Sequence, residues 1–424
     1  MVNFMQKKVL SFLTLLILGI ITFTSCSASQ KKTEGVVTVS LSGWQSSPTE
    51  QQLLQKVLNN FEAKHPGIKV KYDVIAEQYM DVMKTRLIGE TAADVFYLDA
   101  LEAPALMSHG VLEPLNSYVS EFELTDFEPR LLNAFKQHGE IYGFPKDFST
   151  LALFYNKKAF KIAELSQPPK TWNELREYSK RLTINKNNDK KVEQYGFSFT
   201  PELARQYFML QAFGGKLIDS NGWAEFASDS ASLKGLQLII DQYRRDKTST
   251  QPTDVGAASD DEIFGQGKAA MVIEGTWLIP YLKQTFPAIE FATAEVPTVG
   301  GKKGTMAYTV AYVINKQSKH KPEAWQLISY LTGKEGMKAW TSQGTALPTR
   351  KSVAAALGYD KNPLYAPFLT GAAYATIWQA GENLPTILTN FNNQFISAML
   401  GEQPLSIAMQ KAQETADREI ELAK

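Results

Sequence analysis

Aromatic and polar side chains recur at the predicted strand ends and turns of this sequence, where a fold can bring them together. Aromatic rings can stack on the apolar C–H faces of a sugar, and carboxylates, amides and guanidinium groups can bond its hydroxyls. Each residue alone is a weak indication, because a tryptophan more often belongs to a core, but together they are what a neutral carbohydrate site needs. The residues are Trp44, Tyr79, Asp99, Asp147, Trp277, Arg350, Tyr374 and Trp378.

Recognisable catalytic motifs are absent from the sequence. The four histidines, His65, His109, His138 and His320, lie far apart, with no pair at the helical spacing of metal ligands. The chain has no G-x-S-x-G motif, and the Gly- and Lys-rich residues 300–305 lack the spacing of a phosphate-binding loop. Carboxylates are abundant, so an exported carbohydrate-cleaving enzyme with two facing carboxyl groups stays an alternative.

The first 25 residues have the pattern of a secretory signal peptide. A lysine pair precedes an uncharged apolar run, residues 9–23, which is shorter than a typical membrane-spanning helix. Cys26 is the one cysteine, so it cannot form an internal disulfide. Its position resembles the lipobox of bacterial lipoproteins, although Phe23 stands where that motif usually carries an aliphatic residue. The resemblance implies a diacylated Cys26 and a polar tether over residues 26–35, with cleavage without lipidation as the alternative.

Length and charge limit the remaining possibilities. Removing 25 of the 424 residues leaves 399, which is enough for two lobes that each bury a core. Lys+Arg and Asp+Glu both number 44, so no net charge attracts nucleic acid or an anionic membrane surface. Beyond the first 25 residues, no apolar run is long enough to span a bilayer.

Residues 140–156 are predicted to pass from one lobe to the other. A turn is expected around Pro145, because proline fixes its own φ and pushes the preceding residue toward extended geometry. An apolar strand is expected over residues 151–155. Polar groups where a chain passes between two packed units tend to line a cleft, so Asp147 or Ser149 is expected to face a ligand. The alternative is an ordinary hairpin in which Asp147 is a solvated turn residue.

A strand–helix–strand unit is predicted near the start of the mature chain. Residues 36–41 are rich in β-branched residues, a helix begins after Ser47 as its N-cap, and residues 68–74 alternate between apolar and polar. Such a unit implies parallel strands joined by a right-handed crossover.

Ligands of parallel sheets bind at the carboxyl ends of the strands. Trp44 and Gln45 follow the first predicted strand at this edge. Asp99 follows a third predicted strand, residues 94–98, at the same edge. The alternative for Trp44 is that it caps the core.

Several short segments follow one another in a recognisable order along the chain. They are Ala93-Asp94-Val95-Phe96-Tyr97, Gly110-Val111-Leu112-Glu113-Pro114-Leu115, Tyr142-Gly143-Phe144-Pro145, Leu153-Phe154-Tyr155-Asn156, Thr171-Trp172-Asn173-Glu174-Leu175, Met271-Val272-Ile273-Glu274-Gly275-Thr276-Trp277 and Leu347-Pro348-Thr349-Arg350. In this order and spacing they resemble the extracellular solute-binding proteins (family 1) of carbohydrate ABC transporters, in the maltose-binding-like group. The resemblance covers nearly all of the mature chain.

The resemblance implies an α/β fold of two lobes joined by three hinge crossovers, the type II periplasmic-binding-protein fold. It places an N-lobe over residues 36–147 and 307–333 and a C-lobe over residues 148–306 and 334–424. It implies high-affinity binding of a sugar, either a di- or oligosaccharide or a related glycoside, and delivery to an ABC permease by lobe closure. The Asp-Arg pair that some maltose binders carry near Asp99 is absent, so malto-oligosaccharide specificity is not implied.

The resemblance also implies the setting of the protein. It implies an exported monomer without catalytic residue, cofactor or metal, whose partners are the sugar and the permease subunits. Cys26 would anchor it to the outer face of the bacterial cytoplasmic membrane. A polyol or glycerol-phosphoester binder is the alternative within this class, and it would need a cationic pocket, for which Arg350 is the candidate.

By resemblance, Trp277 matches the aromatic residue that stacks on the sugar, and Gly275 precedes it in the same loop. Trp44 and Gln45 occupy the first contact loop, and Tyr79 belongs to the same predicted ligand set. Further ligand contacts are expected from Asp99, Asp147, Ser149, Arg350 and either Tyr374 or Trp378.

Overall fold

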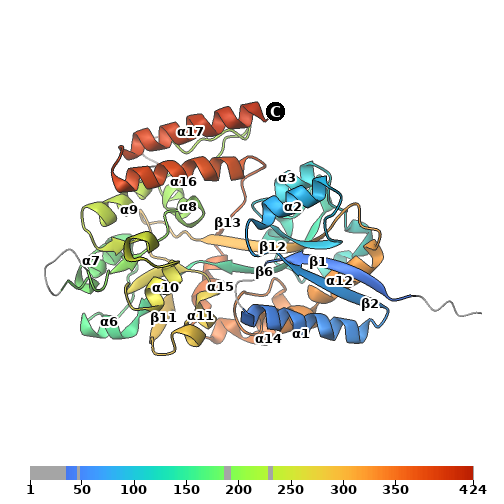
Figure 1. The fold of residues 1–424 in the computed structure, drawn as a ribbon. Helices are drawn as coiled ribbons and strands as arrows, with labels where there is room; N and C mark the ends of the chain where they lie inside the picture. The colour runs from blue at the N-terminus through green and yellow to red at the C-terminus, as the bar shows by residue number, and fades with distance from the viewer. Residues whose placement is uncertain (1–34, 45–47, 186–191, 228–232, 424) are drawn as a thin grey trace, which may run out of the picture. The chain divides into compact units, whose positions relative to one another are not determined.

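The computed structural model describes residues 35–44, 48–185, 192–227 and 233–423, and its strands form two main β-sheets (Figure 1). The strands of the first sheet are β1 (Val37–Gly43), β2 (Ile68–Val74), β3 (Val95–Asp99), β6 (Gly143–Thr150), β12 (Met306–Ile314) and β13 (Thr376–Ile377). Those of the second sheet are β7 (Ala152–Asn156), β8 (Phe197–Ser198), β9 (Ser249–Thr250), β10 (Met271–Glu274) and β11 (Phe291–Ala294). A short separate ladder pairs β4 (Lys136–Gln137) with β5 (Glu140–Ile141).

The first sheet has the order β13-β12-β3-β1-β2, and β6 also pairs with β12. Strand β1 is parallel to β2 and to β3, and helix α1 (Pro48–Lys64) connects β1 to β2. The predicted strand–helix–strand unit is therefore confirmed. Strand β12 enters antiparallel to β3, so the sheet is mixed.

Two hydrophobic clusters cover the two faces of the first sheet. One packs Val39, Leu41 and Tyr97 against α1 and α12, and the other packs Phe96 and Leu98 against α2 and α3. Alternate residues of β3 therefore enter opposite cores, as expected of a strand that is buried on both faces. The helices on this side are α2 (Tyr79–Ile88), α3 (Ala103–Ser108), α4 (Glu121–Leu124), α5 (Pro129–Asn133), α12 (Lys321–Leu331), α13 (Lys334–Thr341) and α14 (Lys351–Leu357).

The second sheet has the order β11-β7-β10-β8-β9 and is surrounded by the remaining helices. Two further clusters form its core, one with Leu153 and Met271 and the other with Phe154 and Val272. The long helices α16 and α17 lie side by side and pack onto the first of these clusters (Figure 1). The helices here are α6 (Lys157–Ile162), α7 (Trp172–Leu182), α8 (Leu203–Gln211), α9 (Lys234–Arg244), α10 (Asp260–Gly265), α11 (Leu278–Thr285), α15 (Ala366–Ala372), α16 (Leu384–Leu400) and α17 (Leu405–Leu422).

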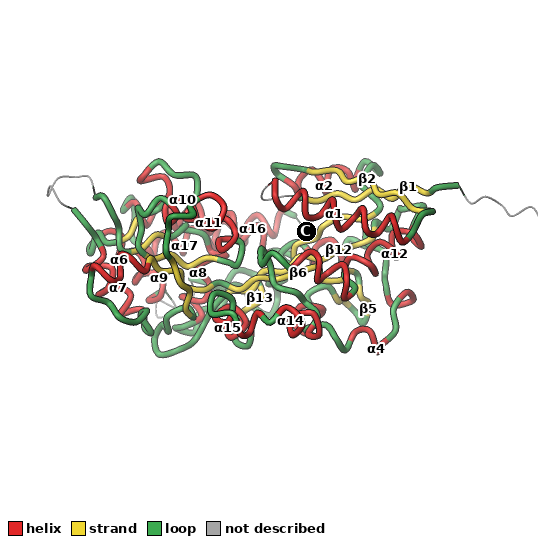
Figure 2. Tube along the Cα trace, turned by 90° about the horizontal axis from the view of Figure 1, so that it is seen from below, coloured by secondary structure: helices red, strands yellow, loops and turns green. Residues whose placement is uncertain are grey.

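Strands β6 and β12, called here the crossing strands, connect the two sheets. Strand β6 belongs to the first sheet up to Thr150, and β7 begins in the second sheet at Ala152. The two crossing strands pair in antiparallel fashion and lie side by side in both views (Figure 2). The turn expected around Pro145 is instead part of β6, whose residues are all buried. Tertiary pairing with β12 therefore overrides the local turn signal of proline.

The predicted lobe boundaries stay predictions, and two segments, α13 and the residues around β13, pack in ways that are relevant to them. Helix α13 contacts α1, and its residues Met337 and Trp340 belong to the core of the first sheet. Strand β13 pairs with β12 in that sheet, whereas Trp378, just after it, is buried in the core of the second sheet. In the part of the chain that the structure describes, no helix is long and apolar enough to cross a membrane.

Candidate ligand-binding site

Gly275-Thr276-Trp277, called here the Trp277 loop, connects β10 to α11. The indole of Trp277 is half-buried, and its centroid lies 6.2 Å from that of Tyr308 at an interplanar angle of 60°. A Cβ atom added to Gly275 would lie 2.1 Å from the indole ring of Trp277. The indole thus folds back over Gly275, and any side chain at position 275 would force the ring to move.

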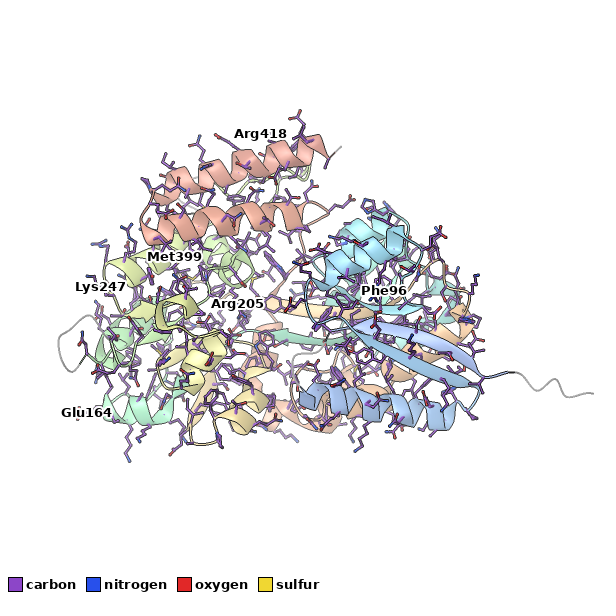
Figure 3. The ribbon with its side chains drawn as sticks, in the orientation of Figure 1. Phe96, Glu164, Arg205, Lys247, Met399 and Arg418 are labelled. Atoms are coloured by element: carbon purple, nitrogen blue, oxygen red, sulfur yellow. The ribbon has the colours of Figure 1, made fainter. Side chains whose placement is uncertain are left out.

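An ion pair lies next to this indole. Arg205, near the start of α8, has a guanidinium nitrogen 2.6 Å from an oxygen of Glu274, the residue that precedes the Trp277 loop. Glu274 is only 1% exposed, whereas the arginine side chain is 25% exposed. The guanidinium carbon lies 6.0 Å from the Trp277 ring centroid. Arg205 lies on the second-sheet side, near the crossing strands (Figure 3). Tyr308 of β12 donates to the carbonyl of the preceding residue, Ala204, at 2.7 Å.

Two further carboxyl groups, those of Asp260 and Asp261 on α10, lie near the ion pair. Asp260 accepts hydrogen bonds from the hydroxyls of Ser198 and Thr200. Burial raises the pKa of Asp260 to about 6, and the negative charge of Glu274 adds to the rise. Burial raises the pKa of Asp261 to about 8, again with a contribution from Glu274. Asp261 is therefore largely protonated at neutral pH, and Arg205 forms its ion pair with Glu274. Among the described residues, this pair leaves no excess positive charge beside Trp277.

Trp44, Tyr79, Tyr97 and Tyr312 form a second group of rings, called here the first aromatic cluster, on the first sheet. Trp44 meets Tyr79 and Tyr97 edge-on at 4.9 and 5.2 Å between centroids, and Tyr97 meets Tyr312 at 5.3 Å. The Tyr79 hydroxyl is bonded to backbone, because it lies 3.0 Å from the carbonyl oxygen of Tyr97 and accepts the Tyr97 amide at 3.0 Å. Trp44 and Tyr79 thus pack together against the core, as the core-cap alternative for Trp44 describes.

The charged residues of β6 are buried next to this cluster. Val310 pairs with Asp147 and Ala311 pairs with Pro145, so Lys146 is the extra residue of a β-bulge. A bulge lets two consecutive side chains share one side of a strand, and Lys146 here forms an ion pair with Asp147. The lysine ammonium also lies over the rings of Tyr97 and Trp340, at 4.9 and 4.2 Å. The Trp340 indole N–H donates to Asp147 at 2.6 Å.

The solvated-turn alternative for Asp147 is wrong, because Asp147 lies in β6, is 7% exposed and is bonded to Lys146 and Trp340. Its role as a ligand contact stays a prediction. Asp99, at the end of β3, is half-buried and accepts the Leu101 amide at 2.8 Å. Burial raises the pKa of Asp99 to about 6, and the charges of Glu102 and Asp147 add to the rise.

Three other predicted contacts are engaged elsewhere. The guanidinium of Arg350 donates to the Thr332 carbonyl at 2.6 Å and to Asp126 at 3.3 Å. Tyr374 donates to Glu295 at 2.8 Å, and Trp378 is buried in the second core near Tyr207. Gln45, a predicted ligand contact, and Cys26, the predicted lipidation site, lie outside the described residues.

The structure brings Gly275, Trp277 and, through Thr276, Ser149 together, and it brings Trp44 together with Tyr79. Sequence reasoning missed Arg205, Glu274 and Tyr308, the partners of Trp277. Glu274 directly precedes the predicted loop, and Arg205 is a lone charge in an apolar stretch of helix, so both left a weak signal. Among the described residues, no three His, Cys, Asp or Glu side chains are grouped so that they could hold a metal ion.

Comparisons with known proteins agree on one family. Residues 45–338 match the family model described as bacterial extracellular solute-binding protein. A Brucella abortus protein, named only as a binding protein, is 26% identical over 351 residues, which cover 79% of this chain and 82% of the relative. The arabinooligosaccharide-binding protein of Bacillus subtilis is 24% identical over 80% of each chain.

A solved structure is similar over nearly the whole chain. It is an ABC substrate-binding protein of Listeria monocytogenes in complex with cycloalternan, with a TM-score of 0.83 and 20% identity over 91% of this chain and 99% of that one. At this identity the likeness establishes the fold, and it confirms the predicted two-lobe, type II α/β architecture. The matched family model covers well over half of the residues, and the chain therefore belongs to the bacterial extracellular solute-binding protein family.

Proposed function

We propose that this protein binds a neutral di- or oligosaccharide, or a related glycoside, outside the cytoplasm and delivers it to an ABC permease by lobe closure. The observation that carries the proposal is the half-buried indole of Trp277 beside the Arg205–Glu274 ion pair. An aromatic face next to fixed hydrogen-bonding groups is the combination that a sugar ring requires. Relatives support the same ligand class, since those compared above are an arabinooligosaccharide-binding protein and a protein solved with cycloalternan.

The charged groups near Trp277 and at Arg350 favour a neutral ligand over a phosphoester. The negative charge of Glu274 balances the positive charge of Arg205, and the carboxyl groups of Asp260 and Asp261 lie near this pair. Arg350, the cation that a phosphoester site was expected to use, is bonded to Asp126 and to a backbone carbonyl. Among the residues that the structure describes, an anionic ligand would therefore meet no unpaired positive charge at either place.

Binding without turnover is the second part of the proposal. A glycoside-cleaving enzyme needs two carboxyl groups that face the scissile bond from opposite sides. The carboxyl groups of Glu274 and Asp260 are buried and already bonded to Arg205 and to two hydroxyls. Prolonged incubation with oligosaccharides should leave them intact, and the appearance of shorter products would contradict this part.

A thermal-shift screen tests the ligand class. The panel contains maltotriose, mannotriose, arabino-oligosaccharides, mannitol and glycerol phosphoesters, and a ligand that binds only the folded protein must raise the melting temperature. We expect a shift with at least one neutral saccharide, lost in Trp277→Ala and kept in Trp325→Ala. Trp325 is a matched control because it is also partly buried, but it packs against Tyr118 and Phe144 on the first sheet. Shifts with phosphoesters alone would contradict the proposal.

We also propose that Cys26 is lipidated and holds the exported protein at the membrane surface. The proposal depends on the lipobox-like residues before Cys26 and on the family, whose members act outside the cytoplasm. Expression in a bacterial host with labelled palmitate should label the protein but not Cys26→Ser. Equal labelling of both would remove the anchor from the proposal.

A further inference from the structure

Ser149 and Tyr308 face each other across the crossing strands. Ser149 lies on β6 and Tyr308 on β12, and the two are direct partners in the antiparallel register. Directly opposed residues of an antiparallel pair place their side chains on the same face. Both side chains accordingly reach the Trp277 loop, Ser149 through Thr276 and Tyr308 through the indole itself.

The hydroxyl of Ser149 is fully used inside the protein. It donates to the Thr150 carbonyl at 2.9 Å and accepts the backbone amide of Thr276 at 3.0 Å. The Thr276 hydroxyl lies 3.2 Å from the same oxygen and donates to the Thr345 carbonyl at 2.9 Å. Ser149 and Thr276 are both buried. A serine hydroxyl has a single proton, so Ser149 has none left to donate to a ligand.

Tyr308 holds the other side of the loop. Its ring lies against the Trp277 indole, and its hydroxyl donates to the carbonyl of Ala204, the residue before Arg205. Arg205 in turn is paired with Glu274, which directly precedes the loop. Thr276 therefore attaches the loop to β6, and Trp277 attaches it to β12. The ion pair of Arg205 with Glu274 adds a further contact at the start of the loop.

We infer that Ser149 and Tyr308 are positioning residues that hold the Trp277 indole in a fixed relation to both crossing strands. The indole has little freedom of its own, because it folds back over Gly275 and depends on the backbone of residues 275–277. Fixing the Thr276 amide therefore fixes the ring. Any displacement of the indole is transmitted to β6 and β12 together, the two strands by which the sheets are connected. That a sugar seats on Trp277 rests on the proposed function, whereas this coupling exists without ligand.

Fluorine NMR of the ligand-free protein labelled with 5-fluorotryptophan measures the coupling. Trp277→Phe identifies the Trp277 resonance by its loss. We expect Ser149→Ala to shift and broaden that resonance, because the Thr276 amide loses its acceptor. Tyr308→Phe, which keeps the ring and removes the bond to Ala204, should shift it less. Thr332→Val is the matched control, since Thr332, at the end of α12, is also buried and its hydroxyl donates to the Ile328 carbonyl at 2.8 Å.

An unchanged position and width of the Trp277 resonance in a folded Ser149→Ala protein would overturn the inference. Equal shifts of the Trp277 resonance in Ser149→Ala and Thr332→Val would also overturn it, because the shift would then reflect a general loss of packing and not the Ser149–Thr276 bond. If Ser149→Ala does not fold, the hydrogen-exchange rate of the Thr276 amide in the unaltered protein tests the inference instead. A Thr276 amide held by Ser149 exchanges at least about a hundredfold more slowly than an unstructured amide, and unprotected exchange would refute the bond. No saccharide is present in these measurements, so their failure is distinct from failure of the proposed function.

Discussion

The first aromatic cluster and the Trp277 loop contain the same kinds of residues, but their charged groups differ in exposure. In the first cluster the Tyr79 hydroxyl is bonded to backbone, and Lys146 is enclosed by Asp147, Tyr97 and Trp340. Around Trp277 the indole and Arg205 stay partly exposed next to buried carboxyl groups. Residue type therefore does not distinguish a packed core from a candidate site. The two regions differ in the exposure of their charged groups, because the Lys146 side chain is 5% exposed and the Arg205 side chain is 25% exposed.

The largest effect is expected from breaking the buried ion pair of the first cluster. Asp147→Ala leaves the Lys146 ammonium, 5% exposed, without its carboxylate. Removing one partner of a buried pair typically costs about 3–5 kcal/mol in the free energy of unfolding. Urea denaturation should show this loss, while Glu335→Ala, which removes the exposed partner of Lys64, should change little. Equal effects of the two substitutions would mean that the first cluster is not held by this pair.

A smaller effect, of opposite sign, is expected between pH 6 and pH 8 from Asp261→Asn near the Trp277 loop. Folded Asp261 keeps its proton up to a pKa of about 8, whereas the unfolded chain releases it above 3.8. The unfolded state thus binds fewer protons, and the free energy of unfolding falls as pH rises through this window, by up to about 1.4 kcal/mol per pH unit. Asparagine has no proton to lose, so the variant should be more stable than the unaltered protein at pH 8.

Urea midpoints at pH 6 and pH 8 check this prediction. The decline between these pH values should be steeper in the unaltered protein than in Asp261→Asn. Asp260, with its pKa raised to about 6, contributes a decline of the same sign mainly below this range. Identical declines in both proteins would show that Asp261 is not the titrating group.

The smallest change in stability is expected from Arg350→Ala, which tests whether Arg350 belongs to the candidate site. Arg350 bonds the Thr332 carbonyl and Asp126, and its guanidinium carbon lies 4.1 Å from the Phe127 ring centroid. Arg350→Ala should lower the free energy of unfolding by about 2 kcal/mol through these lost contacts. Saccharide affinity per folded molecule should stay unchanged in calorimetric titration. A tenfold loss of affinity would return Arg350 to the site that the family resemblance implied.

Local signals in the sequence predicted much of the fold. The first strand–helix–strand unit forms as expected, and Thr171 caps α7 in the way its spacing from Glu174 favours, since its side chain accepts the Glu174 amide at 3.2 Å. Strand β6 was not predicted, because Pro145, Lys146 and Asp147 look like turn residues. Their burial depends on a bulge opposite β12 and on Trp340, which lies 193 positions beyond Asp147.

The candidate site could be predicted only in part for the same reason. Trp277 and Gly275 stand together in one loop and are visible as a pair. Arg205 meets Glu274 across 69 positions, and Ser149 meets Thr276 across 127. Partners at such separations leave no periodicity and no spacing to read. The sequence identifies the polar residues, but the fold determines whether each side chain is buried against a partner in the chain or is exposed to a ligand.

Calorimetric titration of Trp277→Ala and Trp44→Ala with the saccharide found by thermal shift tests the difference between the two regions most directly. Loss of the Trp277 indole in Trp277→Ala should weaken saccharide binding by tenfold or more, which is about 1.4 kcal/mol. Trp44→Ala should bind like the unaltered protein once its lower stability is accounted for. Undiminished affinity in Trp277→Ala, with loss of binding in Trp44→Ala, would place the sugar on the first aromatic cluster instead.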